Sequence, residues 1–128
     1  MLIEDVLRQH CTDVGISRAI IGRLPQALQS GVETAAINKV SEPALVTKDD
    51  THSIYRCRLQ LSLRGAHDVL EQRVAALKAI DMRGDYDSGS LTVVRAVRFS
   101  FQTKLVQTEH DTSDLLVYDT FFHYQINN

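Results

Sequence analysis

The segment from Ile54 to Ile80 constrains the fold of this chain most strongly, because a long strand pattern runs through one glycine into a helix pattern. Apolar and polar side chains alternate there with a period of two, as in a strand with one buried face. The apolar members are Tyr55, Cys57, Leu59, Leu61 and Leu63. The polar members are Arg56, Arg58, Gln60, Ser62 and Arg64. The predicted strand, 52–64, exceeds the usual five or six residues or so, which suggests that something besides the domain's own core uses its length.

A helix is predicted to follow this strand after Gly65. Its buried stripe has helical spacing and consists of Leu70, Val74, Leu77 and Ile80. Asp68 and Glu71 stand three residues apart, as in a capping box with Asp68 in the capping role. Arg83 and Gly84 form a typical stop signal, so we expect the helix to end there.

The rest of the chain predicts one further helix and several strands. Helical spacing runs from Leu2 to Val14 and ends at Gly15. The expected strands and loops follow from alternation, β-branched residues and turn residues. Strands are expected at 19–22, 34–40, 91–97, 99–105 and 115–126, and loops at 43–52 and 107–114. This order predicts an α+β fold in which a mostly antiparallel sheet of about four to five strands packs against an amino-terminal helix and a central helix.

Length and composition exclude several classes of function. The 128 residues fit a single domain, 1–128, that buries a core without disulfides or metal. The formal net charge is −2 and no run of lysine or arginine occurs, so we expect no nucleic acid as the main partner. No apolar stretch approaches the roughly 20 residues of a membrane span. Glu4 and Asp5 stand where a signal peptide would be positive, so we expect a cytoplasmic protein without membrane contact.

The sequence offers no arrangement of residues that would support catalysis. None of the five histidines forms a helical pair or lies beside a cysteine at ligand spacing, so we expect no metal site. The acidic cluster at 109–111 is interpreted as a hydrated loop. Cys57 lies on the apolar face of its strand, away from its arginine neighbours, and we expect a buried structural thiol that forms no disulfide with Cys11. We therefore expect no catalytic residues, no cofactor and no enzymatic activity.

The arginines of the long strand leave two interpretations open. Arg56, Arg58 and Arg64 project from one face, and like charges there must be solvated or answered by acids. One interpretation is a solvated face. The other is a subunit interface, in which a symmetry mate would supply carboxylates. The candidate carboxylates are Glu109, Asp111 and Asp114.

The last predicted strand is apolar on both faces. One face carries Leu116, Tyr118, Thr120, Phe122, Tyr124 and Ile126, and the other carries Val117, Asp119, Phe121, His123 and Gln125. Either the domain itself covers both faces of such a strand, or the domain covers one face and a neighbouring subunit covers the other. Phe121 is thus either an interface anchor or a core residue beneath a helix, and with His123 it completes the candidate interface.

The order of these segments resembles the small tail-terminator, or tail-completion, proteins of tailed bacteriophages and prophages. The resemblance covers most of the chain. It lies in the amino-terminal helix, the Pro-containing segment at 23–25, a strand near 35–37, the long strand 55–65 with its helix, and a closing strand around 117–120.

This resemblance implies an α+β subunit that forms a homo-oligomeric ring, often a hexamer, on the head-proximal end of a tail tube. Its partners would be the tail tube protein and the head-tail connector, in the host cytoplasm during assembly and then in the virion tail. The loops at 43–52 and 107–114 would be candidates to order on docking. Two alternatives stay open: another neck or head-completion protein, and a small cytoplasmic module that binds a peptide or ligand.

Overall fold

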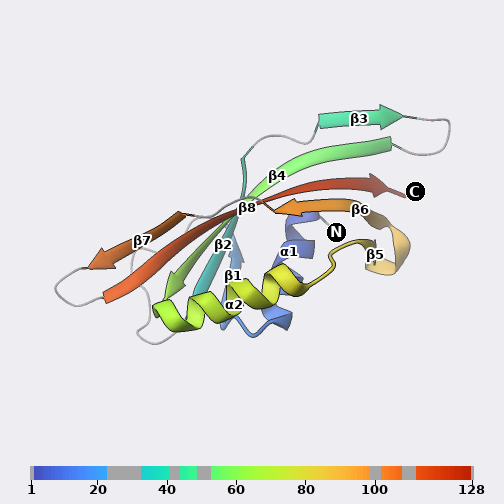
Figure 1. Cartoon of the computed structure of the whole chain (residues 1–128). Coiled ribbons are helices and arrows are strands. Elements are labelled where there is room, and N and C mark those ends of the chain that lie inside the picture. Colours follow the sequence, from blue (N-terminus) through green and yellow to red (C-terminus); the bar gives the residue numbers. More distant parts are fainter. Residues whose placement is uncertain are drawn as a thin grey trace.

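The computed structural model describes residues 2–22, 33–40, 44–48, 53–98, 102–107 and 112–127. These residues form two α-helices and eight strands that pair into one sheet (Figure 1). In chain order the elements are α1 (Ile3–Asp13), β1 (Arg18–Ile21), β2 (Thr34–Lys39), β3 (Ala44–Lys48), β4 (Ser53–Gly65), α2 (His67–Ala79), β5 (Gly84–Tyr86), the 3₁₀ turn η1 (Asp87–Gly89), β6 (Leu91–Arg98), β7 (Gln102–Gln107) and β8 (Thr112–Ile126).

The antiparallel pair of β4 and β8 is the centre of the sheet, and each of these long strands has two successive partners on its other edge. β4 pairs first with β3 and then with β2, while β8 pairs first with β7 and then with β6. The sheet therefore forks, with the order β1-β2-β4-β8-β7 at one end and β3-β4-β8-β6-β5 at the other. In Figure 1 the two ends of the sheet, one with β7 and the other with β3, extend in opposite directions from the central pair. The length of β4 thus has a use within the sheet, since one strand serves two sets of neighbours.

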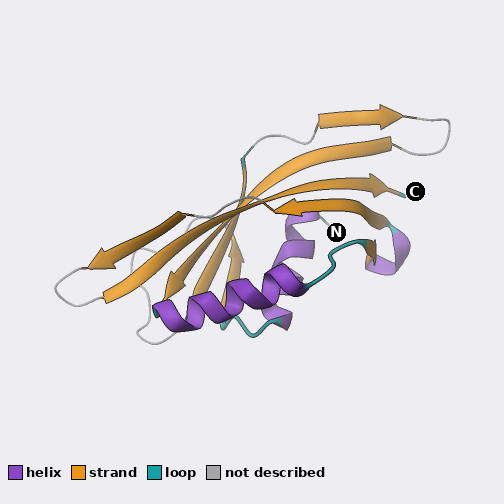
Figure 2. Ribbon diagram, in the orientation of Figure 1, coloured by secondary structure: helices purple, strands orange, loops and turns teal. Residues whose placement is uncertain are grey.

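Both helices pack on the same face of the sheet (Figure 2), where the core lies. The core residues of β4 and β8 alternate along each strand, as predicted. They are Cys57, Leu59, Leu61 and Leu63 from β4 with Leu116, Tyr118, Phe122 and Tyr124 from β8, all at most 5% exposed. The helices contribute Ile3, Val6, Leu7 and Cys11 from α1 and Leu70, Val74 and Leu77 from α2. We call the opposite side, which neither helix covers, the helix-free face.

The class of fold agrees with the sequence prediction, but the number of strands does not. The sheet is antiparallel except for the parallel pair of β1 and β2. It has eight strands in the described residues instead of four to five. Part of the expected loop 43–52 is β3, and the expected loop 107–114 contains the first residues of β8. Short segments such as β3 gain their backbone hydrogen bonds from a neighbouring strand, which local patterns do not reveal.

The ends of α2 differ from the prediction. The helix begins at His67, its N-cap is Ala66, and no side chain makes a capping hydrogen bond. Asp68 therefore lies inside the first turn, where a carboxylate still favours the positive end of the helix dipole. The helix ends at Ala79 because Ile80 has extended backbone angles, and Gly84 belongs to β5 instead of the helix end.

A part-buried ion pair ties α2 to the residue that precedes β2, and a hydrogen bond from the same arginine ties α2 to the end of α1. The Arg73 Nη2 atom lies 3.2 Å from Glu33 Oε1, and Arg73 Nη1 donates a hydrogen bond of 3.3 Å to the backbone carbonyl of Val14. Burial alone would raise the pKa of Glu33, but hydrogen bonds from the backbone, Arg73 and Ser17 lower it overall. The ionised carboxylate therefore stabilises this junction.

Candidate interaction surface

Strand pairing brings side chains from three neighbouring strands together on the helix-free face. The register of β4 and β8 places Arg56 opposite His123, and the register of β6 and β8 places Arg95 opposite the same histidine. Arg56 and Arg95 are exposed and His123 is half-buried. We call these three residues the basic row, since they lie side by side across β4, β8 and β6.

The basic row holds His123 in its neutral form. Its pKa is lowered from 6.5 first by burial and then by the positive charges of Arg95 and Arg56. The buried Nδ1 atom of His123 makes no hydrogen bond with any described residue. The row therefore consists of two exposed guanidinium groups on either side of a half-buried imidazole.

Arg58 occupies a different environment, although it is only two residues from Arg56. Its Nη2 atom lies 2.5 Å from Asp119 Oδ2, and its guanidinium group lies 5.7 Å from the centre of the Phe121 ring. The carboxylate that forms an ion pair with Arg58 thus comes from the neighbouring strand, β8, of the same chain. The half-buried Phe121 packs beside this cation on the helix-free face, not beneath a helix.

Arg64 does not join the other candidate residues. It lies near the far end of β4, opposite Thr34 on one side and Leu115 on the other, with Gln60 and Ser62 between it and Arg58. The five predicted interface residues therefore form two adjoining pairs, Arg56 with His123 and Arg58 with Phe121, and one separate arginine. Of the acids expected to meet them, Glu109 and Asp111 lie outside the described residues, as does the side chain of Asp114.

The sequence did not identify Arg95 as part of this surface, nor Asp119 as the partner of Arg58. Strict alternation from Leu91 and Val93 would place Arg95 on the buried face. The register of β6 shifts between Val93 and Arg95, and this β-bulge turns the arginine to the helix-free face. The available signal was that Arg95 is charged in an otherwise uncharged stretch, 91–97. A charge that alternation would bury is a reason to expect a bulge.

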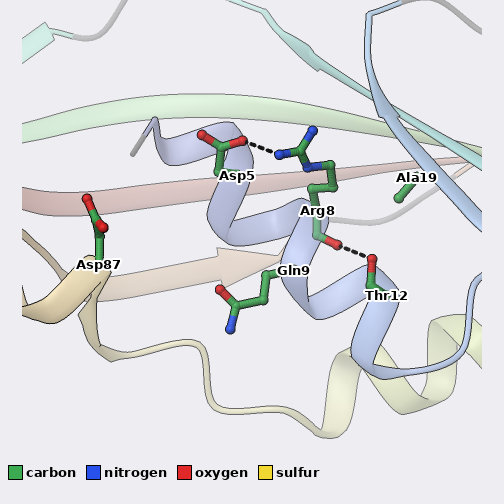
Figure 3. Close-up of a pocket in the computed structure, with 6 residues that line it drawn as sticks. All are labelled: Asp5, Arg8, Gln9, Thr12, Ala19 and Asp87. Carbon is green, nitrogen blue, oxygen red and sulfur yellow. Dashed lines mark hydrogen bonds and ion pairs between the residues drawn. The ribbon is translucent and has the colours of Figure 1, made fainter.

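A hollow lies elsewhere, beside α1 (Figure 3). It measures about 650 Å³, is wide open, and is lined by Asp5, Arg8, Gln9, Thr12, Ala19 and Asp87. The Nη2 atom of Arg8 lies 2.8 Å from Oδ1 of Asp5, so the two charges neutralise each other. The Thr12 hydroxyl donates a hydrogen bond to the backbone carbonyl of Arg8. A smaller hollow of about 260 Å³ lies between α2 and Leu116. Neither hollow combines enclosure with convergent polar groups, which a small-ligand site needs.

Two further observations concern metal binding and membranes. Within the described ranges, no three His, Cys, Asp or Glu side chains gather closely enough to hold a metal ion. No helix in the described part of the chain has the length and apolar character required to cross a bilayer.

Comparison with known proteins found a likeness of fold to a solved structure. A scan against models of protein families found no match, and neither did a comparison with curated protein sequences. Among solved structures, the fold is similar to a chain from the virion of a native gene transfer agent particle, with a TM-score of 0.57 and 10% sequence identity. The match covers 96% of this chain and 94% of that chain. At this identity the likeness is one of fold, and it extends over nearly all of both chains.

Proposed function

We propose that this protein is a structural, non-enzymatic component of a phage-like virion. The observation that carries this proposal is the fold likeness to a gene transfer agent virion chain, which covers almost the full length of both proteins. A match of that extent relates whole subunits instead of a shared motif. The helix-free face adds support, because it presents arginine and aromatic side chains, which are enriched at protein interfaces.

Within the virion, we propose a role in terminating or completing the tail tube and joining the tail to the head. The order of segments, which resembles that of phage tail-terminator proteins, supports this assignment. The protein would act as a homo-oligomeric ring, such as a hexamer, that contacts the tail tube protein on one side and the connector on the other. Assembly would take place in the host cytoplasm and the ring would remain in the virion tail.

A ring requires heterologous contacts, in which one patch of a subunit meets a different patch of the next. The helix-free face offers one such patch, formed by the basic row together with Phe121. Arg56 and Arg95 are exposed, so a neighbouring subunit could reach both. Arg58 would contribute to this patch through its packing on Phe121, since its charge is already neutralised by the ion pair with Asp119.

A neck or head-completion protein is the nearest alternative, and the same fold likeness supports it equally. The two roles differ in the partner that is bound. Purified protein should therefore be presented separately with tail tubes and with connector complexes of the phage or prophage that encodes it. Retention on tubes supports the tail-terminator role, whereas retention on connectors alone supports the neck role.

The general proposal is tested by light scattering over a concentration series, followed by electron microscopy of any oligomer and of protein mixed with tail tubes. We expect closed rings, either in free solution or on the tube end. A protein that stays monomeric at every concentration and binds neither tubes nor connectors would overturn the proposal.

A further inference from the structure

The basic row places two positive charges on either side of His123, and no acid in the described part of the chain balances them. Arg56 and Arg95 lie two strand spacings apart, roughly 10 Å at the backbone. Like charges at that spacing repel each other, so an anion bound between them would be stabilised by both. Asp119 is the one acid of β4, β6 and β8 whose side chain the structure describes, and it is engaged by Arg58. No described carboxylate pairs with Arg56 or Arg95.

The three side chains also have complementary geometry for one ligand. Two guanidinium groups flank an imidazole on adjacent strands, and guanidinium binds carboxylate through paired, charge-assisted hydrogen bonds. We propose that the basic row is the docking point for an acidic segment of a neighbouring virion protein, one carboxylate of which lies between Arg56 and Arg95 and against His123. This inference rests on the proposed function in one respect, namely that the partner is another protein of the assembly.

Docking of a carboxylate would change the protonation of His123. The charged groups that face the histidine are Arg56 and Arg58 from β4 and Arg95 from β6, with Asp119 on its own strand. Because Arg58 and Asp119 neutralise each other, the lowered pKa of His123 reflects burial first and then the two uncompensated arginines, Arg95 and Arg56. A bound carboxylate opposes the effect of those arginines, so the pKa of His123 rises on docking. Docking therefore takes up protons and strengthens as the pH falls.

The inference can be tested on the whole protein with a hexaglutamate peptide as the probe, at low ionic strength. The His123 ring resonance, assigned with a His123→Gln variant, is followed by NMR from pH 8 to pH 5.5 with and without peptide. We expect saturable binding, a higher pKa of His123 in the complex, and an affinity that rises by about tenfold for each unit of that increase.

The decisive variant is the double substitution Arg56→Gln and Arg95→Gln, which removes both flanking charges from exposed positions. We expect it to weaken peptide binding at least about tenfold, with the fold intact by circular dichroism. The matched control is the double substitution Arg18→Gln and Arg83→Gln, which removes the same charge from exposed positions outside the basic row and should leave binding unchanged. Equal weakening in both variants, or an unchanged pKa of His123, would overturn the inference.

A phosphate arm separates carboxylate from other anions. If inorganic phosphate at matched ionic strength displaces the peptide at concentrations below that of the peptide itself, the row is a phosphate site and the carboxylate assignment is wrong. Oligomeric state is recorded for the same samples. Peptide binding at the row in a protein that neither assembles nor binds tubes would refute the proposed function alone. Intact assembly with no peptide binding at the row would refute this inference alone.

Discussion

The ion pair between Glu33 and Arg73 should make stability depend on pH in a direction that the structure fixes. Replacing Arg73 by methionine keeps much of the side-chain stem but removes the charge and the bond to the Val14 carbonyl. Charge-assisted hydrogen bonds stabilise by about 1.5 to 3 kcal/mol. The contacts here are long, 3.2 to 3.4 Å, and the Arg73 side chain is 30% exposed. We therefore expect a value around or below the lower end of that range, a loss of about 1 to 2 kcal/mol at pH 7.

The sign of the pH dependence follows from the lowered pKa of Glu33. A carboxyl group with a folded pKa below its unfolded value contributes its full stabilisation above the unfolded pKa, here 4.5. That contribution is lost as the pH falls through the folded value. The difference in unfolding free energy between wild type and Arg73→Met should thus be largest near pH 7 and shrink below pH 4.5, leaving the part due to Val14.

Urea denaturation followed by circular dichroism measures this difference at each pH. The control is Arg83→Met, since Arg83 and Asp81 form an ion pair whose side chains are 67% and 61% exposed. Such exposed pairs contribute little, so the effect of Arg83→Met should be much smaller than that of Arg73→Met at every pH. A difference for Arg73→Met that is the same at pH 7 and pH 3 would refute the reasoning, because it would show that the charge of Glu33 contributes nothing.

Three further predictions concern the core and the strand ends. Leu61→Ala should lower the free energy of unfolding by about 2 to 5 kcal/mol, because Leu61 is fully buried. Gln60→Ala, on the other face of β4, should lower it by less than about 0.5 kcal/mol. Similar thermal unfolding of the two variants would mean that the faces of β4 are reversed. Burial raises the pKa of Cys11 to about 12, so iodoacetamide at pH 8 should modify it only in urea, and rapid labelling of the native protein would contradict its burial. Gly65→Ala would place a Cβ atom 3.1 Å from the Cβ of Glu33 and should lower the free energy of unfolding by about 1 to 3 kcal/mol. Unchanged unfolding would contradict this, because it would show that the end of β4 can shift to make room.

The elements that local pattern determines were predicted from the sequence. The alternation around Leu61 identified both the long strand and its buried face, because a period of two and a hydrophobic face are properties of the segment itself. The first helix and the stripe of α2 followed from helical spacing in the same way. The ends of α2 did not, since Asp68 has capping chemistry but the backbone turns into the helix two residues earlier, at Ala66.

Features that depend on distant partners were not predictable from local patterns. β3 becomes a strand because the first half of β4 offers it hydrogen bonds, and its own five residues carry too weak a pattern. The alternation predicted that Arg56 and Arg58 face away from the core. It put Phe121 and His123 on the second face of the last strand, where Phe121 could be an interface anchor or a core residue. It could not show the register that pairs them.

Two details of the surface depend on that register. Asp119 became the partner of Arg58 because β4 and β8 are adjacent and antiparallel. Arg95 reached the surface through a bulge, which reverses the alternation. The sequence therefore predicted the face of the candidate site but not its composition.

The structure also changes which charges should be reversed to test the interface. Reversal at Arg58 would disrupt its contact with Asp119 within the chain, so any loss of assembly could reflect a damaged sheet. Arg56 and Arg95 are exposed and make no such contact with a described acid. Their replacement by glutamate therefore tests association without the same risk to the fold.

Our main hypothesis is that the helix-free face is an assembly interface in a phage-like virion. Electron microscopy tests it most directly, on tail tubes incubated with wild-type protein or with the Arg56→Glu and Arg95→Glu double variant. The account predicts that wild-type protein forms rings that cap tube ends. It predicts that the double variant, folded by circular dichroism, leaves the ends bare. Capping by the double variant at the wild-type level would contradict the account.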